Sequence, residues 1–244
     1  MAATAPMAPM PPTWVYSISP TYVSQYMFRG NRRGQDSFQG AIDATNNAWD
    51  VGIWASNPIG SVFVQGQSEP EVDGYASYTY PLNSAWSVEP GISLYTFTKA
   101  PTNLGFFHAT VEPNLALNYL VDGFKLQPKF YYDVTLRAPT EELNASYALP
   151  LKDLGTELDF SGSIGTYYQY NAYNHSVPKT HAWGDYWSLG VAAPYNLTKD
   201  VKLTVGWAYD AGFDAYVKQQ GFARRHGPEV NGKGVFSVSL TYTW

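Results

Sequence analysis

The chain has 244 residues, of which 45% are hydrophobic and 16% aromatic, while charged residues make up only 14%. That charged fraction lies well below the roughly 25% of soluble domains, and a net charge of -5 offers no basic surface for nucleic acid. The absence of cysteine excludes a disulfide framework, a cysteine-based zinc site and a thiol nucleophile.

The first residues, MAATAPMAPMPP, have neither the basic n-region nor the apolar core of a signal peptide. We expect residues 1–13 to form a flexible Pro/Ala-rich tail and residues 14–244 to form one domain. No stretch approaches the roughly 18 apolar residues that a membrane-spanning helix needs.

Large apolar residues alternate with small or polar ones along most of the remaining chain. A period of two is typical of a strand with one apolar face. The pattern predicts about twelve strands, at Trp14–Arg29, Phe38–Thr45, Trp49–Ser56, Glu71–Tyr80, Trp86–Thr98, Gly105–Tyr119, Phe124–Arg137, Glu141–Leu149, Thr156–Tyr170, Trp183–Ala193, Val201–Tyr209 and Val235–Trp244.

The long connections between these strands all fall on the same rim of the predicted sheet. Every second connection is short, as at Asn46-Asn47 and Asp122-Gly123, whereas the longest is the segment 211–234. Short turns on one rim, long loops on the other and an even strand number are typical of outer-membrane barrels. Four prolines fall inside predicted strands, namely Pro20, Pro90, Pro113 and Pro128. We expect local bulges at the last three, which lie at similar depth on neighbouring strands.

The last strand shows the alternation most clearly, because Val238, Leu240 and Trp244 share one face and small hydroxylic residues the other. The sequence thus predicts an all-β, transmembrane, antiparallel up-and-down β-barrel of about twelve strands with both termini on the periplasmic side. Burial of Ile53 or Val205 against a second layer would contradict it. We expect interface aromatics at Trp14, Trp49, Trp86, Tyr119, Trp187, Trp207, Tyr242 and Trp244.

The first predicted hairpin carries a family resemblance. Residues 26–30 read YMFRG, residues 38–43 contain Phe38-Gln39-Gly40 and Asp43, and residues 51–57 read VGIWASN. Over roughly residues 15–95 the chain resembles the TorF-like porins, a conserved hypothetical (Gcw_chp) family of bacterial outer-membrane proteins. The resemblance implies a bacterial outer-membrane location and a pore, and it names no solute.

The alternation also assigns an inner face. Phe28 is expected to face lipid, and Arg29 to face the lumen at the outer rim, either as a pore-lining group or in an ion pair with an inward carboxylate such as Asp43. An excess of inward acids predicts a preference for cations. The predicted lumen-lining residues are Arg29, Asp43, Asp50, Trp54, Glu71, Asp73, Glu89, Glu112, Lys125, Lys129, Asp133 and Arg137.

Catalytic and metal-binding patterns are weak. His108 and Thr110 have the spacing of a barrel lipase without its serine. Asp210, Asp214 and His226 could meet at the outer rim, as in a barrel protease, only by chance. The loop histidines His175, His181 and His226 could bind a metal at the rim, but loop histidines are typically solvated. We therefore predict no enzyme, catalytic residue, metal or cofactor. The expected partners are outer-membrane lipid and lipopolysaccharide, the barrel-assembly machinery through the C-terminal strand, and small solutes, without nucleic acid.

The pattern favours an outer-membrane channel for passive diffusion of small hydrophilic solutes, with a preference for cations. One alternative is a structural or interaction barrel with a plugged lumen and no transport role. A second alternative is a soluble ligand-binding barrel, which would stay dissolved without detergent.

Overall fold

The computed structural model describes residues 13–62, 70–100, 102, 107–170, 181–213 and 232–244, and strands dominate all the long ranges. In the described part of the chain, no helix is long and apolar enough to cross a bilayer. The strands are β1 (Val15–Val23), β2 (Tyr26–Phe28), β3 (Asn31–Gly34), β4 (Ser37–Thr45), β5 (Trp49–Pro58), β6 (Glu71–Tyr78), β7 (Tyr80–Pro81), β8 (Trp86–Phe97), β9 (Ala109–Val121), β10 (Phe124–Asp133), β11 (Ala138–Leu151), β12 (Thr156–Tyr170), β13 (His181–Asn196), β14 (Val201–Phe213) and β15 (Lys233–Thr243).

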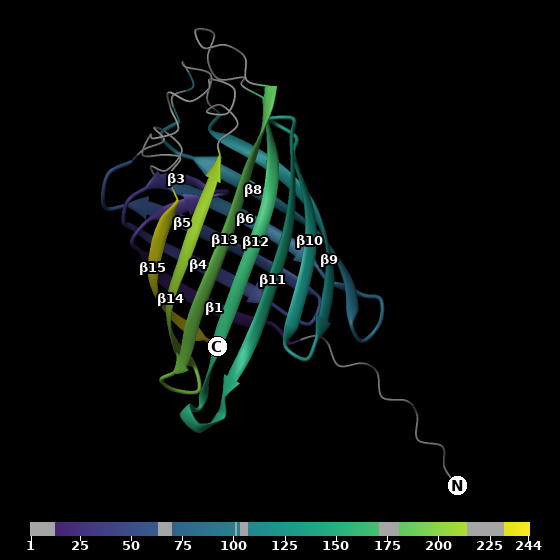
Figure 1. The fold of residues 1–244 in the computed structure, drawn as a ribbon, viewed down its shortest axis with the longest axis vertical. Coiled ribbons are helices and arrows are strands. Elements are labelled where there is room, and N and C mark those ends of the chain that lie inside the picture. Colours follow the sequence, from purple (N-terminus) through teal and green to yellow (C-terminus); the bar gives the residue numbers. More distant parts are fainter. Residues whose placement is uncertain (1–12, 63–69, 101, 103–106, 171–180, 214–231) are drawn as a thin grey trace.

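Twelve of these strands form a closed antiparallel barrel (Figure 1). Each strand pairs with the next along the wall, β6 pairs with β8, and the first strand pairs with the last through contacts such as Ile18 with Tyr242. The two-residue strand β7 continues the line of β6 along β8. The predicted fold class is confirmed, and closure leaves no sheet edge unpaired.

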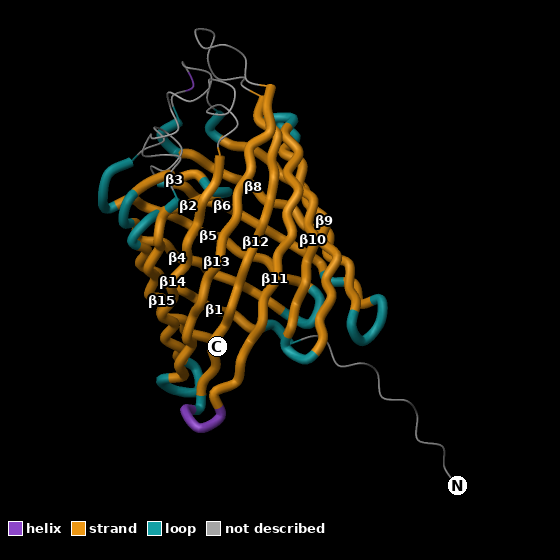
Figure 2. Tube along the Cα trace, viewed as in Figure 1, coloured by secondary structure: helices purple, strands orange, loops and turns teal. Residues whose placement is uncertain are grey.

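The short connections gather at one end of the barrel, together with the C-terminus (Figure 2). They include the 3-10 turn η2 (Lys152–Leu154) and the two-residue turn Asp122-Gly123, whose φ angles are 49° and 79°. Two positive φ angles make the type I′ turn that joins twisted antiparallel strands best. In outer-membrane barrels the short-turn rim is the periplasmic one.

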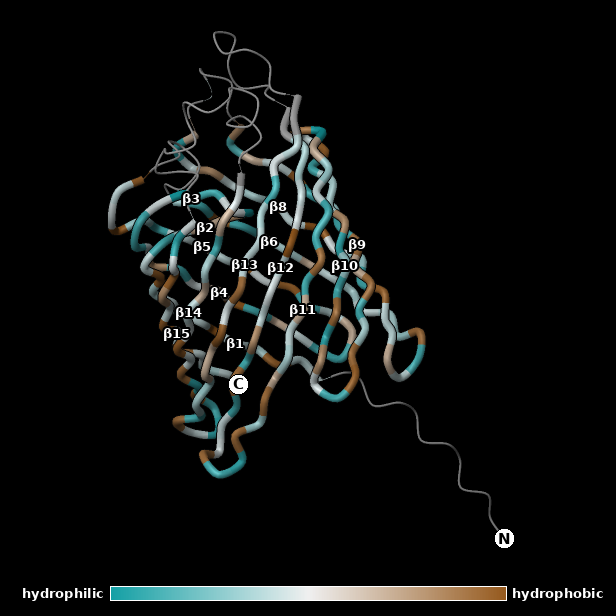
Figure 3. The backbone as a smooth tube through the Cα atoms, in the orientation of Figure 1, coloured by the Kyte–Doolittle hydropathy of each residue, from teal (hydrophilic) through white to brown (hydrophobic). Residues whose placement is uncertain are grey.

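The outer surface of the barrel is apolar. Ile53 is 57% exposed, Val205 40% and Leu240 43%, and no second layer covers them among the residues that the structure describes. Figure 3 shows hydrophobic positions alternating with polar ones along the wall strands. A closed barrel with an outward apolar surface satisfies its backbone internally and presents that surface to lipid, which is the architecture of outer-membrane proteins.

The first predicted strand is wrong in its second half. The wall strand β1 ends at Val23, and residues 26–34 turn back as the separate β2–β3 hairpin. Arg29 and Gly30 form its two-residue turn with φ angles of 48° and 73°. No proline or glycine marks the break at Ser24-Gln25, and only the polar Ser24 interrupts the apolar face between Tyr22 and Tyr26.

The expected bulges at the prolines are also wrong. Register continues unchanged past Pro90, from Ser77 with Gly91 to Tyr80 with Val88. A proline removes one N–H from one ladder but inserts no extra residue, so pairing has a gap without a shift. The register shift that the described strands do show lies between Tyr26 and Met27 in the hairpin.

The end of β10 differs from the prediction as well. This strand stops at Asp133, whose Oδ1 accepts a hydrogen bond of 2.7 Å from the backbone N–H of Leu136 and so closes a turn. Arg137 lies exposed in that turn with a φ of 54°. The prediction that Arg137 continues the strand and lines the lumen is therefore wrong.

Candidate functional site

The β2–β3 hairpin lies inside the barrel, toward the end away from the short turns (Figure 2). It contacts the wall at several points around the lumen. Tyr26 donates a hydrogen bond of 2.7 Å to Glu71 Oε2 on β6, and Asn31 Nδ2 donates one of 2.8 Å to the Tyr167 hydroxyl on β12. The hairpin therefore crosses the lumen instead of extending into solvent.

The strongest of these contacts joins Arg29 to Glu112. Arg29 Nη1 and Nη2 donate to Glu112 Oε2 and Oε1 at 2.9 and 2.8 Å, a bidentate pair, and the Tyr95 hydroxyl donates to Oε1 at 2.9 Å. The guanidinium carbon also lies 4.9 Å from the ring centroids of Phe28 and Tyr131. Burial alone would lower the pKa of Arg29, but Glu112 outweighs burial and holds that pKa above its usual value, so the guanidinium stays charged.

The partner of Arg29 lies far away along the wall. From β1 through β4, β5, β6 and β8, the fifth strand reached is β9, which carries Glu112. The sequence analysis expected Arg29 to pair with a nearby carboxylate such as Asp43, and this expectation is wrong. Asp43 instead accepts hydrogen bonds from the hydroxyls of Tyr75 and Ser17.

Gly30 brings the tip of the hairpin against the wall. A Cβ at this position would lie 2.7 Å from Tyr186 Cβ, 2.8 Å from Gly212 Cα and 2.9 Å from the Ala211 carbonyl oxygen. Two of these atoms belong to backbone, which cannot rotate away. Glycine is thus required here both by its positive φ and by its close approach to β13 and β14.

Tyr26 fixes the other end of the hairpin. Its side chain is 6% exposed, and its ring packs 5.8 Å from Trp54, centroid to centroid. Burial and the neighbouring Glu71 raise the pKa of Tyr26 well above its usual value, so the hydroxyl keeps its proton and acts as a donor. Because Glu71 is only 4% exposed, this hydrogen bond satisfies a buried carboxyl group.

Phe28 lies inside the lumen, although the alternation of the sequence predicted that it would face lipid. Its ring meets Tyr95 edge-on with centroids 6.0 Å apart. Tyr26 and Phe28 share the parity of the lipid-facing Tyr22 on β1, and only the separate hairpin turns them inward. The alternation gave the wrong direction for the Phe28 side chain because it assumes that the wall strand continues through this residue.

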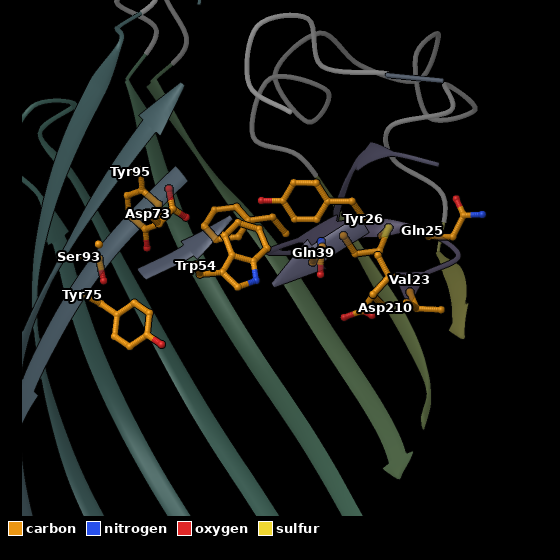
Figure 4. Close-up of a pocket in the computed structure, with 14 residues that line it drawn as sticks. Val23, Gln25, Tyr26, Gln39, Trp54, Asp73, Tyr75, Ser93, Tyr95 and Asp210 are labelled. Carbon is orange, nitrogen blue, oxygen red and sulfur yellow. The ribbon is translucent and has the colours of Figure 1, made fainter. Parts of the chain in front are cut away.

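A cavity of about 460 Å³ lies where the hairpin meets the wall. The hairpin contributes Met27 and Phe28, and the wall contributes Trp54 on β5, Asp73 on β6 and Asp210 on β14. Figure 4 shows Asp73, Tyr75, Ser93 and Tyr95 on one side of this space and Val23 and Asp210 on the other. The cavity is thus part of the lumen itself.

Two other predicted lumen residues, Glu89 and Lys129, make contacts on β8, β9 and β10, which also carry polar residues that the sequence analysis did not name. Asn118 donates to Glu89 Oε2 at 3.1 Å, and Gln127 donates to Asn118 Oδ1 at 2.6 Å. The ammonium nitrogen of Lys129 lies 5.0 Å from the Tyr131 ring centroid. Among the described residues, Asn114 has a buried Oδ1 without a hydrogen-bond partner.

The remaining predicted lumen positions lie on strands at different depths. Asp50 is near the start of β5 and exposed, Lys125 is near the start of β10, and Asp133, 4% exposed, ends that strand. Glu142, another inward carboxylate, accepts hydrogen bonds from the hydroxyls of Tyr131 and Tyr186.

The predicted interface aromatics occupy the outer surface, near strand ends except for Trp187 and Trp207, which lie in the middle of β13 and β14. Trp49 packs against Tyr78 with centroids 4.9 Å apart, Trp86 against Tyr119 at 4.7 Å, and Trp244 stacks on Tyr242 at 5.5 Å. The other predicted members, Trp14, Trp187 and Trp207, are 39%, 41% and 50% exposed. Their anchoring role stays a prediction.

Some of the residues that were considered for catalysis or metal binding lie in the described ranges. No group of three or more His, Asp or Glu side chains in the described ranges could hold a metal ion. His108 is exposed, with a ring nitrogen 3.2 Å from the Phe97 carbonyl oxygen, whereas Thr110 is 4% exposed. Asp214, His175 and His226 lie outside the described residues, and His181, which was expected in a loop, is the first residue of β13.

Solved structures of outer-membrane channels share this fold. The NanC porin superposes with a TM-score of 0.54 at 13% identity, covering 93% of this chain and 98% of its own. The KdgM porin gives 0.54 at 16% identity over 93% and 99%. The COG4313 outer membrane channel from Pseudomonas putida F1 gives 0.53 at 13% identity over 99% and 100%. At these identities the likeness establishes the fold alone.

Sequence comparison identifies the family. Comparison with curated proteins gives no match. The narrower resemblance of the first hairpin to the TorF-like porins stays a prediction. A family model described as "Putative MetA-pathway of phenol degradation" matches residues 45–226, which is well over half of the chain. This chain, a twelve-strand barrel with a hairpin folded into its lumen, therefore belongs to that family.

Proposed function

We propose that this protein is a passive outer-membrane channel for small hydrophilic solutes, with a preference for cations, and that the β2–β3 hairpin forms its constriction. The observation that carries the proposal is a hairpin held across a closed, polar lumen by side-chain bonds to β6, β9 and β12. The barrel channels of like fold, NanC, KdgM and the COG4313 channel, support a channel in general.

The lining of the lumen supports passage of hydrophilic solutes. Apart from Tyr167 and Tyr186, the inward residues of β12–β15 and β1 are mostly small and often hydroxylic, as in the contacts of Ser163 with Ser188 and of Ser19 with Thr241, 2.8 and 3.0 Å between their oxygens. Small side chains on this half of the wall leave room beside the larger tyrosines and charged groups of the other half. A polar lumen is suited to water and small hydrophilic solutes.

The balance of charge supports the cation preference. By the alternation of the wall strands, inward carboxylates outnumber the four inward lysines and the three arginines of the hairpin. The carboxylates are Asp43, Asp50, Glu71, Asp73, Glu89, Glu112, Asp133, Glu142, Glu157, Asp159 and Asp210, and the basic residues are Lys125, Lys129, Lys202, Lys233, Arg29, Arg32 and Arg33. A negative lining raises the local concentration of cations and repels anions.

Recordings from single proteins in planar lipid bilayers test the proposal. We expect stepwise currents in KCl, and a reversal potential under a KCl gradient that favours K⁺ over Cl⁻. A variant in which residues 25–35 are replaced by a short Gly/Ser turn should conduct more, because the constriction is removed. A silent bilayer for both proteins, with β circular dichroism intact, would contradict a channel.

The hairpin contacts also favour a second function, a barrel with a plugged lumen that acts through its outer surface. If the hairpin closes the lumen, the native protein stays silent while the shortened variant conducts. That result would assign the hairpin as a plug and identify the protein as a structural or interaction barrel.

A further inference from the structure

We infer that the lumen cavity beneath the hairpin binds a small organic cation, of the quaternary or tertiary alkylammonium class. That such a cation is also the transported solute rests on the proposed channel function. The cavity volume of about 460 Å³ falls within the roughly 300–1,000 Å³ of small-molecule sites.

The first observation is the aromatic lining. Trp54, Tyr75 and Tyr95 from the wall and Tyr26 and Phe28 from the hairpin all line the cavity. The pairs Tyr26–Trp54 and Phe28–Tyr95 link hairpin to wall, so the aromatic groups come from both sides of the space. Aromatic faces attract alkylammonium ions through their negative quadrupole, and Trp and Tyr do so best.

The second observation is the charge. Asp73, 8% exposed, and Asp210 also line the cavity, and none of its described lining residues is basic. Asp73 accepts one long hydrogen bond, 3.3 Å, from the backbone N–H of Thr96. Within the described ranges no side chain bonds or pairs with Asp210, and its cross-strand neighbour Lys233 forms no ion pair with it. An enclosed carboxylate without a counter-ion is costly, and inside a membrane barrel such groups mark solute paths.

The two observations together exclude other ligand classes. Anions would be repelled by Asp73 and Asp210. Hard metal ions need several converging oxygens, and the described residues contain no cluster of three acidic or histidine side chains. A neutral aromatic solute would not need the carboxylates. An organic cation uses both the rings and the charge.

Calorimetric titration of the full chain, purified in detergent at pH 8, with choline tests the inference. Its neutral isostere 3,3-dimethyl-1-butanol, which has the same shape without the charge, is the matched ligand control. We expect choline to bind at least about tenfold more tightly than the isostere. We expect the double variant Asp73→Asn, Asp210→Asn to weaken choline binding at least about tenfold.

The control variant is Asp159→Asn, which removes an inward carboxylate on β12 that does not line the cavity. It should leave choline affinity within about twofold, because screening weakens charges that are not in contact. Trp54→Leu should weaken choline more than the isostere. Circular dichroism and the shift in electrophoretic mobility on heating verify that each variant is folded.

Equal binding of choline and its isostere, equal loss in the Asp159 and double variants, or no choline binding by the folded protein would each overturn the inference. The bilayer recordings in KCl separate this outcome from the channel proposal. Current without choline binding would refute the cation site alone. Choline binding without current would refute the channel while the site remains.

Discussion

The guanidinium of Arg29 and the carboxylate of Glu112 are joined by two hydrogen bonds, of 2.9 and 2.8 Å, across the barrel. One belongs to the turn of an internal hairpin and the other to β9, the fifth strand around the wall from β1. Glu112 is 1% exposed, so neither charge can be removed alone without leaving the other poorly solvated. The pair therefore joins the turn of the hairpin to β9.

Replacing Glu112 with Gln should release the hairpin. A hydrogen bond to a charged group contributes about 1.5–3 kcal/mol, and at about 1.4 kcal/mol per tenfold change the detached fraction should rise ten- to hundredfold. Hydrogen exchange of the amides in 26–34 and the noise of single-channel current measure this fraction. The double variant Arg29→Ala, Glu112→Ala should open the hairpin no further than Glu112→Gln does, because both remove the same contact. A detached fraction that is clearly larger in the double variant than in Glu112→Gln would contradict the pairing.

Replacing Gly30 with Ala should also displace the hairpin. The new Cβ would meet Gly212 Cα at 2.8 Å and the Ala211 carbonyl oxygen at 2.9 Å, in addition to the cost of a φ of 73°. Gly155→Ala is the matched control, because Gly155 has a φ of 62° and nothing within 4 Å of a built Cβ. The free energy of unfolding of the control should fall by about 1–2 kcal/mol, which is the cost of a left-handed backbone for a residue with a side chain.

The two alanine variants therefore differ only in steric contact. We expect Gly30→Ala to increase hydrogen exchange in the hairpin and to leave β circular dichroism unchanged, because the wall does not depend on the hairpin. Equal behaviour of the two variants would mean that Gly30 does not touch β14 in the membrane.

Much of the fold could be predicted because its signals are local. The alternation of Val235–Trp244, the Asp122-Gly123 turn and the order of the strands depend only on neighbouring residues. The position of the hairpin, in contrast, depends on contacts with residues that are far away in the sequence. Tyr22, Tyr26 and Phe28 keep the same spacing whether the chain continues as a wall strand or turns back into the lumen.

The candidate site was only partly predictable for the same reason. Arg29, Trp54, Asp73 and Glu112 were assigned to the lumen from parity, but the partner of Arg29 lies 83 residues away in sequence. Which carboxylate it meets depends on the barrel order and on the hairpin, neither of which a single strand pattern contains. Arg137 was misplaced because the Asp133 turn ends β10 early.

The two faces of one strand should differ sharply in their tolerance of charge. Leu189 on β13 is 59% exposed on the outer surface, and its neighbour Ser188 points inward to the Ser163 hydroxyl, 2.8 Å away. Leu189→Arg should lower the free energy of unfolding in lipid vesicles by about 2–4 kcal/mol, the cost of an arginine near mid-membrane. Ser188→Arg should cost clearly less, because the lumen is polar. The reverse order in urea unfolding would overturn the assignment of the two faces.

Tyr26→Phe should destabilise the hairpin while Tyr22→Phe should not. Tyr26 donates at 2.7 Å to Glu71, which is 4% exposed, so removing the hydroxyl leaves a buried carboxyl group without its donor. The expected cost is about 1–3 kcal/mol. Tyr22 is 38% exposed on the lipid-facing surface, where loss of a hydroxyl should change stability by less than about 0.5 kcal/mol. Adding Glu71→Gln to Tyr26→Phe should recover part of the loss, because an amide is less costly to bury than a carboxylate. Hydrogen exchange in 26–34 and urea unfolding in vesicles measure both quantities, and identical results for the two tyrosine variants would show that the Tyr26–Glu71 bond does not hold the hairpin.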